Sequence, residues 1–198
     1  MSPATDSRTR MIEGALDLFH RQGVNATSVD QILAASNTGK SQFSYYFKNK
    51  DGLILAVLQY LHELIRSGQT PTGYDINTWD EFDHWFQQYI DFQRSVDFQR
   101  SCPLGTIGTD IPEGKELLRQ EVQSFLEWSR GRLSRFFAER KAADEMVPGV
   151  DPDSLADFCI SIMHGGMLLT KMKRSSDMFE HAAFEALNYI RSLRKTRV

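Results

Sequence analysis

Residues 27–53 carry the most specific pattern in this 198-residue chain and read TSVDQILAASNTGKSQFSYYFKNKDGL. Ser28 and Gln31 can form a capping box, because the hydroxyl and the amide each satisfy a free backbone N–H at a helix start. The helix that they open is predicted to run for about eight residues. Residues 36–39, Ser-Asn-Thr-Gly, then form a turn, and a further helix follows over about 40–47. The segment therefore predicts two short helices joined by a tight turn.

The sequence around this segment extends the helical pattern in both directions. A first helix is predicted from about Asp6 to Gln22, with Gly23 as its stop. Asn49 is expected to cap a longer fourth helix that reaches Ile65. Apolar residues recur every three or four positions throughout, with no sustained alternation of the kind that strands show. We expect an all-α fold of about nine helices.

The remaining helices are predicted from capping signals and turns. A polar loop over about 67–77 is followed by the capping box of Thr78 and Glu81, which opens an aromatic-rich helix. Further helices are expected in a short turn after Pro103 and over about 113–140, 152–173 and 176–194. We predict a DNA-binding domain over residues 1–50, linked by the fourth helix (about 50–67), and a larger helical domain over residues 51–198.

Composition excludes several classes of protein. The chain has 41% apolar residues, ordinary numbers of Gly and Pro, and only two cysteines, which argues against a disordered, collagen-like or disulfide-stapled protein. The polar start predicts no signal peptide, and the longest apolar run, residues 53–61, is too short to cross a bilayer. We therefore expect a cytoplasmic protein. Residues 1–50 carry a net charge of +2 and residues 51–198 one of −5, a modest asymmetry that would let the first segment approach phosphate.

The first three predicted helices suit DNA binding. Three short helices that end in a polar and aromatic third helix are typical of a domain that places one helix in the major groove. Phe43 and Phe47 lie four residues apart and should point inward. The residues expected to face DNA are Lys40, Ser41, Gln42, Ser44, Tyr45 and Tyr46. The Thr27 hydroxyl, beside the start of the second helix, and the Lys50 ammonium are expected to contact phosphates. The alternative is a purely structural role, in which Tyr45 and Tyr46 cover a helix junction and Lys50 is a solvated surface charge.

Three motifs resemble the DNA-binding domain of the TetR family of transcriptional regulators: residues 26–32 (ATSVDQI), residues 39–53 (GKSQFSYYFKNKDGL) and residues 15–23 (ALDLFHRQG). The resemblance covers about residues 8–60. It implies that Thr27 and Lys50 hold the phosphate-contacting positions and that the residues from Lys40 to Tyr46 form the recognition helix. Ser44 stands where family members usually carry Tyr, so the operator or the seating of the helix differs from the usual one.

The resemblance also implies a homodimer and a ligand-binding domain after about residue 70. The apolar faces of the last two predicted helices would form a four-helix bundle across a two-fold axis, and Gly165-Gly166 would permit close approach. A dimer would read a near-palindromic operator. Such a regulator is most simply a repressor that a small molecule releases from DNA.

Candidate ligand-contacting residues come from the aromatic and sulfur-containing side chains of the second half. They are Trp85, Phe86, Tyr89, Cys102, Phe125, Trp128 and Met163. An aromatic stripe at helical spacing is more often core, so packing remains the alternative for each. Residues 100–105 (RSCPLG) resemble a Gly-Cys-Pro-Leu-Gly turn found in a subset of these regulators, some of which respond to electrophiles. A helix start and the adjacent Arg100 would lower the pKa of the Cys102 thiol, although a turn thiol that merely packs is the ordinary outcome.

One pair of residues is typical of a different class of protein, the di-iron helical bundle. Glu81 and His84 form a Glu-x-x-His pair, which di-iron helical bundles need twice, together with two further carboxylates. The chain offers one such pair and no nucleophile triad or phosphate-cradling glycine loop. The alternative is a helical small-molecule-binding or metal-carboxylate protein without DNA function. We expect no enzyme activity, no cofactor and no metal.

Overall fold

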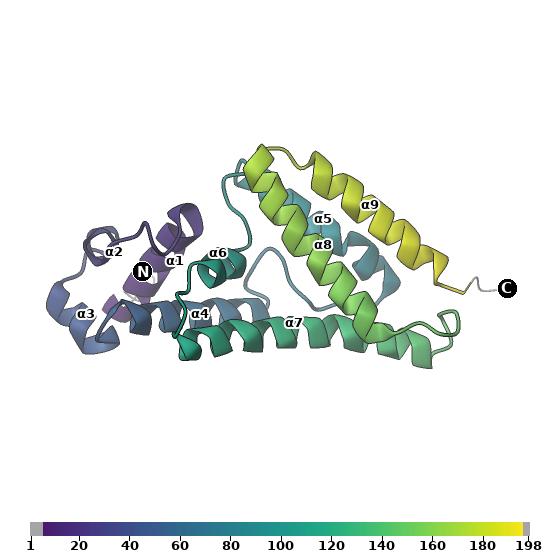
Figure 1. The fold of residues 1–198 in the computed structure, drawn as a ribbon, viewed down its shortest axis with the longest axis horizontal. Coiled ribbons are helices and arrows are strands. Elements are labelled where there is room, and N and C mark those ends of the chain that lie inside the picture. Colours follow the sequence, from purple (N-terminus) through teal and green to yellow (C-terminus); the bar gives the residue numbers. More distant parts are fainter. Residues whose placement is uncertain (1–5, 196–198) are drawn as a thin grey trace, which may run out of the picture. The chain divides into compact units, whose positions relative to one another are not determined.

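The computed structural model describes residues 6–195, and within these residues it is all-α (Figure 1). The described part contains nine helices: α1 (Ser7–Gln22), α2 (Val29–Ser36), α3 (Lys40–Phe47), α4 (Lys50–Arg66), α5 (Trp79–Ser95), α6 (Pro103–Thr109), α7 (Glu116–Ala142), α8 (Pro152–Lys173) and α9 (Asp177–Ser192). The predicted fold class and helix order are confirmed.

Local capping sets most helix boundaries. The Asp6 carboxylate accepts the Thr9 N–H at the start of α1, and the two predicted capping boxes form at α2 and α5. The Asn49 side chain accepts the Gly52 N–H at the start of α4. α7 begins at Glu116, later than predicted, because Gly114 adopts a φ of +81°, a left-handed conformation that a helix cannot contain.

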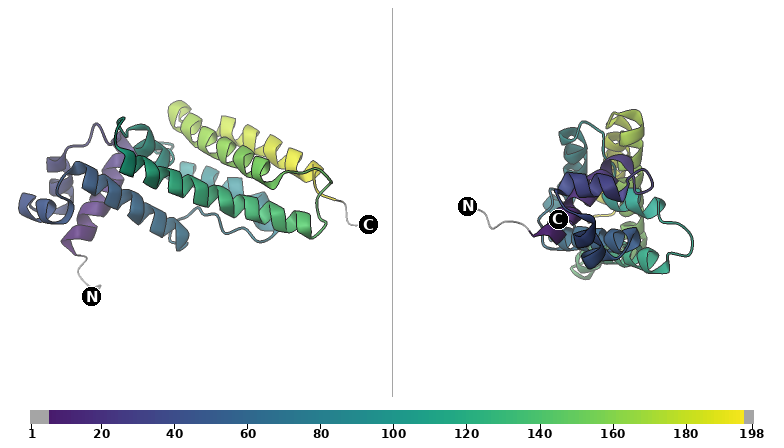
Figure 2. Two further views of the ribbon diagram at one scale, coloured as in Figure 1. Left: turned by 60° about the horizontal axis from the view of Figure 1, so that its bottom comes forward. Right: turned by 90° about the vertical axis from the view of Figure 1, so that its left-hand side faces the viewer.

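The first of two compact units contains residues 6–67 and 102–124 of the described chain. In it α1 packs against α2, α3, α4 and α6, and Figure 2 shows these short helices from two further sides. Phe19, Phe43, Phe47 and Leu53 are buried in its core. The confirmed inward positions of Phe43 and Phe47 leave the opposite face of α3 to solvent.

The second unit contains residues 68–101 and 125–195, so α7 contributes to both units. Here α8 and α9 pack as an antiparallel pair, and α5 packs against both (Figure 1). Gly166 allows this packing, because a Cβ atom there would overlap the Phe179 ring of α9. The two packing units therefore do not coincide with the two predicted domains, which meet at residue 50. The predicted domains were defined by function, and their boundary stays a prediction. No helix in residues 6–195 is both long and apolar enough to span a bilayer.

Candidate nucleic-acid interface and effector half

The outer face of α3 is a polar and aromatic surface. Lys40, Ser41, Gln42, Ser44 and Tyr45 are all exposed, and the Tyr45 side chain is 81% exposed. Tyr46 is 39% exposed, and its ring meets that of Tyr45 edge-on with centroids 5.0 Å apart. Most of the Tyr45 ring is in contact with solvent, so this face is available to a partner.

Two of the predicted DNA contacts already have partners inside the unit. Gln42 accepts the Gly39 N–H at 3.1 Å, and its amide nitrogen donates to the Ser7 hydroxyl at 3.0 Å. Lys40 lies 3.1 Å from the Asp30 carboxylate, and both side chains are well exposed to solvent. An exposed ion pair of this kind is weak, so a phosphate can displace the carboxylate.

Thr27 and Lys50 both bond to the turn between α1 and α2, Thr27 from a buried position and Lys50 from a half-buried one. The Thr27 hydroxyl donates to the Gly23 carbonyl at 2.7 Å, and the side chain is 1% exposed. The Lys50 ammonium donates to the Val24 carbonyl at 2.6 Å. These internal hydrogen bonds position both side chains at the turn, and their contact with phosphates stays a prediction.

A third residue, which sequence reasoning missed, holds the same turn. Asp110, the C-cap residue of α6, accepts the Val24 N–H at 2.7 Å and the Asn25 N–H at 3.2 Å through one carboxylate oxygen. A Cβ atom at Gly23 would lie 2.7 Å from that oxygen. No local pattern could reveal this contact, because it joins residues more than eighty positions apart. The contact joins the end of α6 to the turn between α1 and α2 within the first unit.

The aromatic candidates of the second unit form a packed cluster around Tyr74, a residue that the sequence did not single out. The Tyr74 ring lies 5.6–6.4 Å from the rings of Trp85, Tyr89, Phe125 and Trp128. The Trp85 indole and the Tyr89 hydroxyl both donate to the Gly73 carbonyl, at 2.8 and 3.3 Å. These polar atoms therefore serve the fold.

Two further candidates are also buried in this unit. Phe86 packs edge-on against Phe179 with ring centroids 6.3 Å apart, and Met163 is buried on α8. Contact of any of these aromatic and methionine side chains with an effector stays a prediction.

The thiol of Cys102 does not have the lowered pKa that the sequence predicted. The thiol caps α6 by accepting the Gly105 N–H at 3.5 Å. Burial raises the pKa of Cys102 and outweighs the lowering by the Gly105 and Leu104 backbone N–H groups. The expectation of a lowered pKa is wrong, because burial disfavours the charged thiolate more than the backbone N–H groups at the helix start favour it. Burial also raises the pKa of Cys159, the second thiol.

The Glu81–His84 pair serves the start of α5. The Glu81 carboxylate accepts the N–H groups of Asn77 and Thr78, at 2.7 and 3.1 Å, and these bonds lower its pKa. A His84 ring nitrogen lies 2.7 Å from the Asp80 carbonyl. Within residues 6–195 no group of three or more His, Cys, Asp or Glu side chains is arranged to hold a metal ion.

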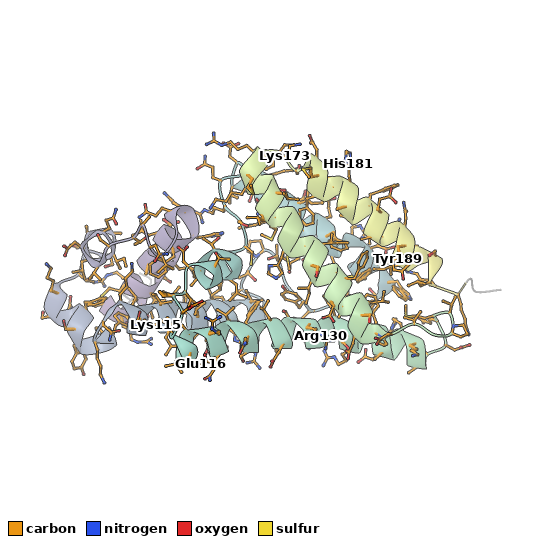
Figure 3. The ribbon with its side chains drawn as sticks, viewed as in Figure 1. Lys115, Glu116, Arg130, Lys173, His181 and Tyr189 are labelled. Carbon is orange, nitrogen blue, oxygen red and sulfur yellow. The ribbon has the colours of Figure 1, made fainter. Side chains whose placement is uncertain are left out.

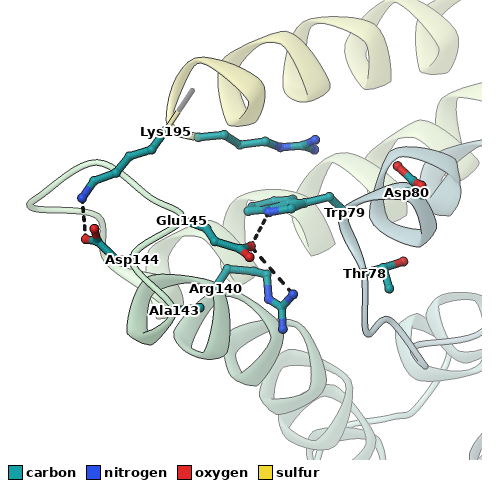
Figure 4. A pocket seen from close by; sticks show the side chains of 9 residues that line it. Thr78, Trp79, Asp80, Arg140, Ala143, Asp144, Glu145 and Lys195 are labelled. Carbon is teal, nitrogen blue, oxygen red and sulfur yellow. Dashed lines mark hydrogen bonds and ion pairs between the residues drawn. The ribbon is translucent and has the colours of Figure 1, made fainter. Parts of the chain in front are cut away.

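A polar cleft of about 750 Å³ lies beside the end of α9 (Figure 4). Its charged side chains pair with one another: Glu145 accepts the Trp79 indole N–H at 2.8 Å and lies 3.8 Å from Arg140, while Lys195 pairs with Asp144. The Arg194 guanidinium lies 4.0 Å from the centre of the Trp79 ring. The Lys195–Asp144 pair joins the segment after α9 to the loop after α7.

The outer faces of α8 and α9 carry a strip of exposed apolar side chains, here called the apolar strip. It consists of Phe158, Leu168, Leu169, Met172, Met178, Phe184 and Tyr189. Figure 3 labels Tyr189 on α9, and its ring meets that of Phe158 edge-on at 5.6 Å. Most of the inward apolar positions on these helices, such as Cys159 and Ile190, pack inside the subunit, so the strip is only partly the face that the sequence predicted.

An exposed helix-turn-helix face in a small helical unit, together with a second helical unit, is typical of a DNA-binding transcriptional regulator. Residues 11–57 match the family model described as bacterial regulatory proteins, tetR family, and residues 81–185 match that of the tetracyclin repressor-like C-terminal domain. The chain belongs to the TetR family of transcriptional regulators, a family that is not enzymatic.

Individual relatives are distant but cover nearly the whole chain. The HTH-type transcriptional repressor DhaR of Mycobacterium sp. (strain GP1) is 24% identical over 92% of this chain and 93% of its own length. The transcriptional regulator AcuR of Cereibacter sphaeroides is 24% identical over 84% of this chain and 77% of its own. The crystal structure of a TetR-family regulator from Cytophaga hutchinsonii superposes with a TM-score of 0.81 at 18% identity, over 99% of this chain and 100% of its own.

Proposed function

We propose that this regulator is a homodimeric repressor that acts in the cytoplasm, binds a near-palindromic operator through α3, and leaves DNA when a small molecule binds its second unit. The exposed face of α3 carries this proposal, because Tyr45 is large, aromatic and almost entirely solvated. The sign of regulation follows the Mycobacterium relative, which is a transcriptional repressor.

The DNA-reading part rests on Lys40, Ser44 and Tyr45, whose side chains are all exposed on α3. Ser and Tyr hydroxyls can bond base edges or phosphates, whereas Lys40 gains a phosphate in place of Asp30. We expect Tyr45→Ala to weaken operator binding by about tenfold or more, because one good base contact contributes about 1–3 kcal/mol. Lys40→Ala should lower the salt dependence of binding by about one unit of slope.

Fluorescence anisotropy on labelled DNA from the promoter beside the protein's own gene tests both variants. Arg135→Ala, an exposed change on α7, is the matched control and should bind as the wild type does. Equal affinities for the Tyr45→Ala variant and this control would contradict α3 as the reading helix.

The dimer proposal rests on the apolar strip, because seven large apolar side chains exposed on two adjacent helices would be shielded from water by a second subunit. A two-fold axis would set two copies of α3 about 34–36 Å apart, one turn of DNA. We expect Phe184→Glu and Met172→Glu to yield monomers in sedimentation velocity. Leu117→Glu, an equally exposed apolar site on α7, should leave the dimer intact. Monomers from all three variants, or dimers from all three, would refute the assignment.

The release mechanism rests on the connection between α5 and α6. Asp97 and Phe98, between these helices, both have left-handed backbones, with φ of 49° and 56°. Such conformations are strained for side chains other than Gly. A ligand that alters the end of α5 can relieve or increase this strain, shift α6 and so move Asp110, which holds the α1–α2 turn. Linkage requires that the ligand weaken operator binding by the same factor by which operator DNA weakens ligand binding.

A further inference from the structure

The second unit contains two fully buried polar side chains that the fold does not use. Gln93 on α5 and Thr170 on α8 are both 0% exposed. Neither the amide oxygen and nitrogen of Gln93 nor the hydroxyl of Thr170 has a hydrogen-bond partner among residues 6–195. Leaving such groups unpaired costs stability, so each needs an explanation other than packing.

Gln93 interrupts an apolar stripe. The other buried side chains on α5 are Phe82, Trp85, Phe86, Tyr89 and Ile90. At helical spacing Gln93 falls on the same face as Phe86, two turns further along. The polar atoms of Trp85 and Tyr89 on this stripe are satisfied by the Gly73 carbonyl, whereas those of Gln93 are not.

Thr170 ends the corresponding stripe of α8. It lies one turn beyond Gly166, on the same buried face. A buried Thr within a helix commonly donates to the carbonyl four residues earlier, as Thr109 does to Gly105, but the Thr170 hydroxyl makes no such bond.

The two stripes meet through α9. The Phe179 ring fills the space over Gly166 and packs on Phe86, so it lies between the two faces. Arg94, the residue after Gln93, forms an ion pair of 2.7 Å with Glu180 at the start of α9. Gln93 and Thr170 therefore belong to the same end of the unit, where α8 turns into α9. Lys173 and His181 mark that end in Figure 3.

We infer that Gln93 and Thr170 are the polar recognition groups for the effector, and that the effector is an uncharged molecule with a hydrogen-bonding amide or hydroxyl group on a mainly apolar body. This inference deepens the proposed function and rests on it. A carboxylate or ammonium buried here would need an opposite charge, and an amide and a hydroxyl supply none. The aromatic stripe accounts for the apolar body of the molecule.

The position of Gln93 links recognition to release. Its backbone carbonyl accepts the Phe98 N–H at 2.9 Å, so the residue that would bind the effector also closes the strained turn after α5. Because both side chains are buried, an effector reaches them only when this end of the unit opens. That opening acts directly on the connection to α6.

The first test needs no effector. Gln93→Met and Thr170→Val keep the shape of each side chain and remove the unpaired polar atoms. Each variant should melt at a temperature about 2–4 °C above the wild type, because the desolvation cost disappears. Gln88→Met, an exposed change on the same helix, should melt as the wild type does. Lower melting temperatures for the two buried variants would show that the polar groups stabilise the fold, and would overturn the inference.

The second test uses four probes of similar size: benzamide, benzyl alcohol, toluene and benzoate. Calorimetric titration of the full-length protein should show binding of benzamide and benzyl alcohol and no binding of benzoate. In the Gln93→Met protein the affinity for benzamide should fall at least about tenfold, while that for toluene stays the same or rises. No binding of either polar probe, or an unchanged affinity for benzamide in this variant, would overturn the inference.

Operator binding of the same proteins separates the two proposals. The wild type and the exposed control Gln88→Met should both bind promoter DNA in the anisotropy assay. Intact DNA binding without discrimination among the probes overturns the polar site alone. Discrimination among the probes in a protein that binds no operator supports the polar site and overturns the operator proposal.

Discussion

Replacement of Asp110 by Ala should loosen the DNA-binding head although α6 lies outside the helix-turn-helix. The carboxylate accepts two backbone N–H groups, from Val24 at 2.7 Å and from Asn25 at 3.2 Å. A hydrogen bond to a charged group contributes about 1.5–3 kcal/mol when it is buried. Val24 is buried and Asn25 is exposed, so only the shorter bond counts in full. We expect Asp110→Ala to lower the free energy of unfolding by about 2–3 kcal/mol and Asp110→Asn, a neutral acceptor, by about half of that.

Urea denaturation followed by far-ultraviolet circular dichroism measures this difference. Asp17→Ala is the matched control, because Asp17 is a half-exposed acid that forms a solvent-exposed ion pair with Arg21 of the same helix, and its loss should cost less than about 0.5 kcal/mol. Gly23→Ala is the complementary change. It leaves Asp110 in place but puts a Cβ atom 2.7 Å from the carboxylate at a φ of +88°, and it should destabilise the head as well. If Asp110→Ala unfolds at the same urea concentration as Asp17→Ala, the carboxylate does not hold the turn.

Three further outcomes follow from the structure. Cys102 should react with iodoacetamide near neutral pH more slowly than a free thiol, because burial raises its pKa, and rapid alkylation would contradict the raised pKa. Cys102→Ser should stay as stable as the wild type, since a hydroxyl also caps α6. Burial alone would raise the pKa of Asp83, but its hydrogen bond to Arg194 and the charges of Arg194 and Arg191 lower it. Asp83 therefore stabilises the fold above its unfolded pKa of about 3.9 and loses this effect as the pH falls through the lower folded value, so Asp83→Asn should flatten the acid side of the stability curve measured by urea titrations at several pH values. Gly166→Ala should lower stability by about 1–3 kcal/mol in the same titrations, because its Cβ would overlap a ring of α9; an unchanged midpoint would show that the ring moves aside.

Local sequence sufficed for the helices and their ends. A cap depends on residues three or four positions apart, so Asp6, Ser28, Asn49 and Thr78 could each be predicted from neighbours in the chain. The exposed face of α3 could be predicted for the same reason, since helical spacing puts Phe43 inside and leaves Tyr45 outside.

Long-range contacts decided the rest. Thr27 and Lys50 carry side chains suited to phosphate, yet both are bonded to carbonyls of the α1–α2 turn, and only the packed head shows this. The contact of Asp110 with that turn, and the unpaired state of Gln93, depend on which distant groups the fold brings near or leaves away. The sequence by itself thus determined the helical class, the helix order and the exposed face of α3, because capping and periodicity act within a few residues. Tertiary structure alone decided which buried polar groups are bonded within the fold and which are left without a partner among residues 6–195, because a hydrogen bond is set by distance in space and not by separation along the chain.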